Sequence, residues 1–185
     1  MGQAVTQFDE DMTVMLREPP VFPVFGRQQL TLAVASNAVG LARAQVNMTL
    51  QQWGAPKSMR SDLLLVVTEL VTNVVRHAAP PPSVVGILDL VLDLLPDTTV
   101  RAQVRDASTR PPVLRTVDME AESGRGLHLV ASFSKRWGSY PVSTGGKVVW
   151  ADVHLNPEPS PAPMSEESPP GVRLLGRVLE AVRDL

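Results

Sequence analysis

Two polar side chains lie one helical turn apart in the segment DLLLVVTELVTNVVRH (62–77), and their types suit phosphate chemistry. Glu69 offers a carboxylate that can orient or deprotonate a nucleophile. Asn73 offers an amide oxygen of the kind that Mg²⁺ accepts beside phosphate oxygens and water. The alternative interpretation is an ordinary solvated face, which Asp62 and Arg76 would share. Apolar residues at helical spacing predict a buried stripe on the other side of this helix: Leu63, Val66, Val67, Leu70 and Val74.

A third candidate is Asp106, which ends the alternating segment TVRAQVRD (99–106). It has the same phase as Val100 and Val104, so its carboxylate is expected to point toward the apolar face of the strand. A buried carboxylate is costly unless hydrogen-bond donors meet it. The amino group of an adenine ring is one such donor, and a backbone cap in the turn after the strand is the alternative.

Gly124 and Gly126 come directly before a predicted helix in SGRGLHL (123–129). Glycines at a helix N-terminus let backbone N–H groups approach a phosphate, although a plain turn is the simpler interpretation of one Gly-X-Gly. The phosphate-binding loop of P-loop enzymes is absent, because Gly146-Lys147 is followed by Val148 and not by Ser or Thr. Gly145-Gly146 itself predicts a hairpin turn.

The elements that must position these residues alternate between helical and extended patterns. Ser36 and Asn37 offer capping side chains for the first helix, and Pro96–Asp97 predicts a tight turn between two strands. The expected strands are 28–35, 87–95, 99–106, 136–140 and 147–155, and the expected helices run from about 37 to 52, from 58 or 61 to 77, and from 126 to about 134.

Composition excludes several classes of site. The chain has 185 residues and no cysteine, which excludes disulfides, thiolate zinc sites and iron–sulfur clusters. The three histidines are scattered without metal-ligand spacing, and a net charge of −2 gives no reason to expect a nucleic-acid surface. An acidic N-terminus and the lack of a run of about 20 apolar residues predict a soluble, cytoplasmic protein.

The predicted organisation has four parts. Residues 1–25 form a flexible lead-in, and residues 26–155 form the domain. Residues 156–170 hold six prolines and form a linker, and residues 171–185 have the apolar spacing of an amphipathic helix that could dock on this chain or on a partner.

Four segments taken in order resemble the boxes of the GHKL ATPase superfamily, whose members share a histidine-kinase-like ATP-binding domain. They are ELVTNVVRHA (69–78), VRDAST (104–109), ESGRGLHLV (122–130) and GGKVVWADV (145–153). Within this superfamily they resemble anti-sigma factor serine/threonine kinases and related short actinobacterial ATP-binding regulators. The resemblance covers roughly residues 25–155.

The resemblance implies an α+β fold, a two-layer sandwich of the Bergerat type with a mixed, mainly antiparallel sheet and helices on one face. It also implies ATP and Mg²⁺ as ligands, a sigma factor or its antagonist protein as partner, and homodimers through the edge of the first strand. The implied roles are general base for Glu69, Mg²⁺ ligand for Asn73 and adenine contact for Asp106. Nucleotide contacts are further implied for Arg76, His77, Ser108, Gly124, Arg125, Gly126 and Leu127.

Two departures from the family pattern leave two functions open. The box after Asp106 lacks the glycines of the fuller motif, and Val148 stands where the last box usually has a threonine near the base. A kinase that phosphorylates an antagonist and sequesters a sigma factor is favoured by the presence of both Glu69 and Asn73. A nucleotide-gated binding regulator without phosphotransfer is favoured by the altered last box and by the segment after Leu155.

Overall fold

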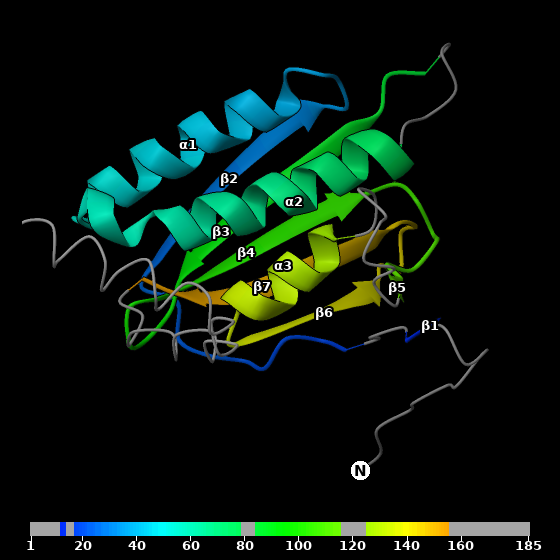
Figure 1. Ribbon diagram of the computed structural model, residues 1–185. Helices are drawn as coiled ribbons and strands as arrows, with labels where there is room; N and C mark the ends of the chain where they lie inside the picture. Colours follow the sequence, from blue (N-terminus) through cyan, green and yellow to red (C-terminus); the bar gives the residue numbers. More distant parts are fainter. Residues whose placement is uncertain (1–11, 14–16, 79–83, 116–124, 156–185) are drawn as a thin grey trace, which may run out of the picture.

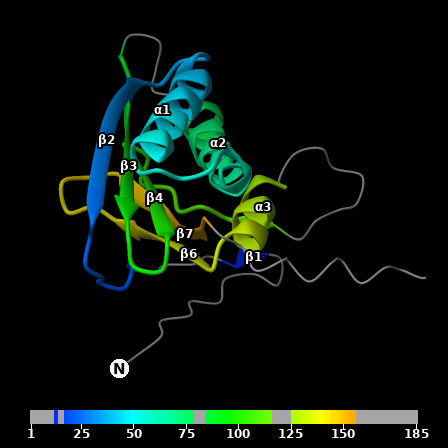
Figure 2. The ribbon, with the colours of Figure 1, turned by 90° about the vertical axis from the view of Figure 1, so that its left-hand side faces the viewer.

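The protein folds into one sheet with helices packed on one of its faces. The computed structural model describes residues 12–13, 17–78, 84–115 and 125–155. The main sheet has five strands in the order β2-β3-β4-β7-β6, and Figures 1 and 2 show α1, α2 and α3 on one side of it. This confirms the α+β sandwich. The expectation of a mixed sheet is wrong for the described strands, because each of their pairings is antiparallel.

The strands follow the alternating segments of the sequence closely. Their bounds are Gly26–Ala33 for β2, Ile87–Leu94 for β3, Thr99–Asp106 for β4, Arg136–Pro141 for β6 and Lys147–His154 for β7. A separate two-stranded sheet joins β1 (Met12–Thr13) to β5 (Leu114–Arg115). The predicted β3–β4 turn is present, with positive φ at Asp97 and Thr98 and a hydrogen bond from the Thr99 N–H to the Pro96 carbonyl.

The helices begin and end near the predicted residues. They are α1 (Ala38–Gln52), the short 3₁₀ helix η1 (Lys57–Met59), α2 (Ser61–His77) and α3 (Gly126–Phe133). The predicted side-chain cap of α1 is wrong, since Asn37 has helical backbone angles and its side chain does not cap the helix. None of the described helices combines the length and apolar character needed to cross a membrane.

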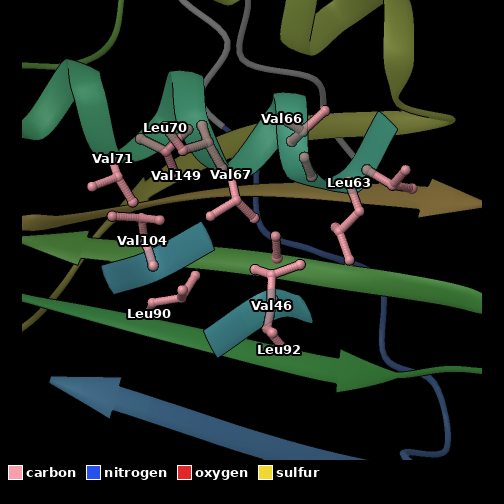
Figure 3. Close-up of a cluster of buried hydrophobic side chains, with 14 of the residues drawn as sticks. Val46, Leu63, Val66, Val67, Leu70, Val71, Leu90, Leu92, Val104 and Val149 are labelled. Atoms are coloured by element: carbon pink, nitrogen blue, oxygen red, sulfur yellow. The ribbon is translucent and has the colours of Figure 1, made fainter. Parts of the chain in front are cut away.

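The core fills the space between the sheet and the helices, as Figure 3 shows for the contact of α2 with β3, β4 and β7. The predicted stripe of α2 is confirmed, because Leu63, Val66, Val67, Leu70 and Val74 are at most 4% exposed. Burying five such side chains outweighs the modest helix propensity of valine and fixes the rotation of α2 about its axis. That rotation directs Glu69 and Asn73 away from the sheet.

The other face of the sheet is partly covered by residues 17–25, which lead into β2. Trp150 Nε1 donates a hydrogen bond to the Arg17 carbonyl at 2.7 Å, and the Phe22 ring centre lies 5.9 Å from the Arg101 guanidinium carbon. The sequence predicts a flexible lead-in here, and residues 17–25 of it make these contacts with the sheet. Its contacts join positions far apart in the sequence, 133 residues in the case of Arg17 and Trp150, which local periodicity does not reveal.

A row of charged side chains crosses that same face. Asp152, which is fully buried, accepts a bidentate pair from Arg101 at 2.6 and 3.0 Å and a further hydrogen bond from Arg136 at 3.0 Å. At the β2 side of the sheet, Arg27 pairs with Asp93. The Arg27 pKa is raised by its hydrogen bond to Asp93 and by the attraction of that carboxylate. The network belongs to the scaffold, and it lies on the opposite face from Glu69 and Asn73.

Candidate functional site

Helix α2 places Glu69 and Asn73 one turn apart and half-buried, on the side that the core leaves open. Neither side chain is hydrogen-bonded to another side chain or backbone group in the described part of the chain. Two polar groups so placed, with unused acceptor atoms, can receive a ligand without breaking an existing contact.

The first residue of α3 lies directly against this pair. A β-carbon added to Gly126 would lie 2.7 Å from Glu69 Oε2 and 3.6 Å from Asn73 Oδ1. The first N–H groups of a helix lack partners within it, and the helix dipole favours an anion at that end. Residues 69, 73 and 126 therefore form one group, in which side-chain acceptor atoms lie beside the N-terminus of α3.

The neighbours of Gly126 have distinct places. Arg125 is exposed and occupies the N-cap position of α3, while the Leu127 side chain is 9% exposed and packs in the core. Only the backbone of Leu127 is thus available for the predicted nucleotide contact. Gly124 lies outside the described residues. Arg76 and His77 are exposed in the last turn of α2.

Asp106 ends β4 and is buried, with 4% of its surface exposed, as its phase in the strand predicts. Its Oδ1 accepts hydrogen bonds from the Ser108 N–H at 2.7 Å and from Lys147 Nζ at 2.9 Å. The first of these bonds is the backbone cap considered from the sequence. The second adds a residue that the motifs did not single out, since the register of β4 and β7 pairs Asp106 with Lys147.

The same register also determines on which face of the sheet Val148 lies. Val148 pairs with Arg105, and its neighbours Lys147 and Val149 face the helices. The Val148 side chain therefore lies on the opposite face of the sheet from Asp106. The side chain of β7 that does meet Asp106 is Lys147.

The turn before β7 packs closely against the backbone of Asp106. Gly145 and Gly146 have φ of 95° and 83°, which confirms the predicted glycine turn, and a β-carbon on Gly146 would overlap the backbone oxygen of Asp106. An open depression of about 420 Å³ adjoins the turn, lined by Asp89 and Arg105 among others. Asp106 also lines this depression, whereas Glu69 and Asn73 do not.

The two groups of candidate residues lie toward one end of the molecule. Figure 1 shows that α2 and β4 end, and α3 begins, at the same end of the two layers. The last turn of α2, the start of α3 and the end of β4 with Asp106 thus lie at a common end of the fold.

Comparison with known proteins identifies the fold family. The family model of the histidine kinase-like ATPase domain matches residues 32–153, which is more than half of the chain. The chain belongs to this family. Its members are ATPase domains, so this histidine kinase-like ATPase domain is an ATP-binding domain.

A solved structure has the same fold. The crystal structure of the RsbU and RsbW domains of Rv1364c from Mycobacterium tuberculosis matches with a TM-score of 0.53 and 22% sequence identity, over 70% of this chain and 32% of that chain. This histidine kinase-like ATPase domain therefore spans about a third of the length of that protein chain. No curated protein matches it.

Proposed function

We propose that this ATPase domain is a serine/threonine protein kinase that phosphorylates an antagonist protein and sequesters a sigma factor when it is free of that antagonist. The observation that carries the proposal is that Glu69 and Asn73 both lie close enough to Gly126 to meet a β-carbon added there. A phosphotransferase needs a base for the acceptor hydroxyl and a holder for the phosphates close to each other, and this contact supports both.

Each role follows from the chemistry of the residue. Asp106 would accept a hydrogen bond from the adenine amino group, and the N–H groups at the start of α3, with Arg125, would bind the phosphates. Asn73 would hold Mg²⁺, which when bound neutralises charge on the phosphate oxygens. Arg76 and His77, in the last turn of α2, would contact the nucleotide from the same helix.

In the transfer itself, Glu69 would accept the proton of the attacking serine or threonine hydroxyl. The acceptor oxygen then forms a bond to the terminal phosphorus, the bond from that phosphorus to its bridging oxygen breaks, and ADP leaves. The open Oε2 atom beside Gly126 supports this role, since no described side chain competes for it.

The test is transfer of label from [γ-³²P]ATP, with Mg²⁺, to a purified candidate antagonist. We expect the wild type to label the antagonist and Glu69→Gln to lose most of the label while it keeps its affinity for ADP. The control is Thr68→Ala, because Thr68 faces α1 and accepts a hydrogen bond from Arg43. Equal labelling by Glu69→Gln and the wild type would contradict the role of Glu69.

The second function is a nucleotide-gated regulator that binds its partner without phosphorylating it. The apolar spacing of residues 171–185 favours it, because a helix that docks on a partner suits partner recognition. Partner binding that depends on ADP or ATP, with no label transferred by the wild type, would support this function and exclude the kinase.

A homodimer through β2 is also part of the proposal. β2 is an edge strand of the main sheet, so one side of its backbone is available to pair with a second copy. Sedimentation equilibrium should then give twice the chain mass at micromolar concentration, and a monomer at all concentrations would contradict it.

A further inference from the structure

The ion pair between Lys147 and Asp106 lies where the proposed function puts the purine base. Lys147 Nζ is 2.9 Å from Asp106 Oδ1, and the exposed fractions of the two side chains are 14% and 2%. Nζ also lies 3.3 Å from the Ser108 carbonyl oxygen. Both groups are thus largely removed from water and held in place by the turn after β4.

The hydrogen bonds at this pair leave one acceptor and one donor unused. Ser108 N–H and Lys147 Nζ both bond to Oδ1 of Asp106, and no other described residue donates to Oδ2. The ammonium group of Lys147 has three N–H bonds, and its two contacts among described residues are Asp106 Oδ1 and the Ser108 carbonyl. A ligand at this corner therefore meets a carboxylate acceptor beside an ammonium donor.

Purine bases present the complementary groups at their pairing edge, in two orders. Adenine offers its 6-amino donor beside the N1 acceptor, and a 6-oxopurine such as hypoxanthine offers its 6-oxo acceptor beside the N1–H donor. A lone carboxylate can meet only the donor, and it repels a neighbouring oxo group. A carboxylate beside an ammonium group can satisfy either order.

We propose that Lys147 is a specificity-determining residue, and that with Asp106 it makes the site bind 6-oxopurine nucleotides as well as adenine nucleotides. This inference rests on the proposed assignment of Asp106 to the base. With adenine, Oδ2 accepts from the 6-amino group and Lys147 donates to N1. With hypoxanthine, Oδ2 accepts from N1–H and Lys147 donates to the 6-oxo group.

The test compares ADP with inosine diphosphate, which differs from ADP at the 6-position and at N1. The ratio of the two dissociation constants is measured by calorimetry, with Mg²⁺, for the wild type, Lys147→Met and Lys147→Arg. We expect inosine diphosphate to bind the wild type within about tenfold of ADP. Lys147→Met should widen this ratio by a further tenfold or so, because the oxo group then faces the carboxylate without a donor. Lys147→Arg, which keeps a charged donor, should retain most of the wild-type ratio.

The ratio separates specificity from stability, since partial unfolding of Lys147→Met lowers the apparent number of sites equally for both ligands. Thermal melting of each variant without ligand gives the folded fraction. A wild type that binds ADP and rejects inosine diphosphate by more than a hundredfold, with the same ratio in Lys147→Met, overturns the role of Lys147 and leaves the proposed function standing. A folded wild type that binds neither nucleotide overturns both.

Discussion

Replacing Gly126 with alanine tests whether the Glu69 carboxylate lies against the start of α3. The added β-carbon would lie 2.7 Å from Glu69 Oε2, which is 0.7 Å inside the 3.4 Å where ordinary contacts begin. Glu69 must then shift or adopt a strained side-chain angle, at a cost of about 1 kcal/mol. Alanine is otherwise favoured over glycine in a helix by up to about 1 kcal/mol, so the net change in unfolding free energy should be close to zero.

The chain supplies a matched control in α1. A β-carbon on Gly40 would have no neighbour within 4 Å, so Gly40→Ala should raise the unfolding free energy by up to about 1 kcal/mol. Urea unfolding followed by circular dichroism measures both variants. In the double variant Gly126→Ala/Glu69→Ala, the alanine at position 126 should stabilise the helix without meeting a carboxylate, so the coupling free energy between the two positions should be about 1 kcal/mol. If Gly126→Ala stabilises as much as Gly40→Ala and shows no coupling to position 69, the described contact is incorrect.

Three further predictions concern the scaffold and its titration. Gly146→Ala should lower the unfolding free energy by about 2 kcal/mol or more, and Gly145→Ala by about half as much. Both glycines have a positive φ, but only a β-carbon on Gly146 would also overlap the Asp106 backbone. Equal decreases in unfolding free energy, measured by urea unfolding, would contradict this prediction. Asp152→Asn should lower the unfolding free energy by about 3 kcal/mol, since it leaves the buried Arg101 without a charged partner. Asp93→Asn should lower it less, because the Arg27 side chain is 60% exposed. The urea midpoint of Asp152→Asn should therefore be the lower of the two, and the reverse order would contradict this. Burial, and secondly the charge of Glu18, raise the pKa of Tyr140 above its ordinary value of 10.0, so its stabilising contribution should be complete below pH 10 and fall as the pH rises through the folded-state pKa. The absorbance of this single tyrosine measures its folded-state pKa, and Tyr140→Phe is the control. A folded-state pKa at or below 10 would contradict the prediction.

Much of the fold follows from patterns within single segments. Alternation over 99–106 predicts both β4 and the burial of Asp106, and the apolar stripe of α2 predicts which face carries Glu69 and Asn73. These features depend on which residues of one element share a face, and the periodicity of that element states it directly.

The parts that could not be predicted depend on pairing between distant segments. The contact of Lys147 with Asp106 and the place of Val148 on the opposite face of the sheet both follow from the register of β4 against β7, which neither strand encodes alone. The packing of residues 17–25 depends in the same way on Trp150, 133 positions away from Arg17. A one-residue shift in register would exchange the places of Lys147 and Val148 opposite Asp106.

In the proposed function, the polar face of α2 holds a magnesium-bound adenine nucleotide through Asn73. Calorimetric titration of ADP with Mg²⁺ into the wild type, Asn73→Ala and the control Thr68→Ala tests it most directly. We expect micromolar binding to the wild type and to Thr68→Ala, and binding at least about tenfold weaker to Asn73→Ala. This difference in affinity should disappear when Mg²⁺ is removed. Equal affinity of Asn73→Ala and the wild type in Mg²⁺ would contradict the account.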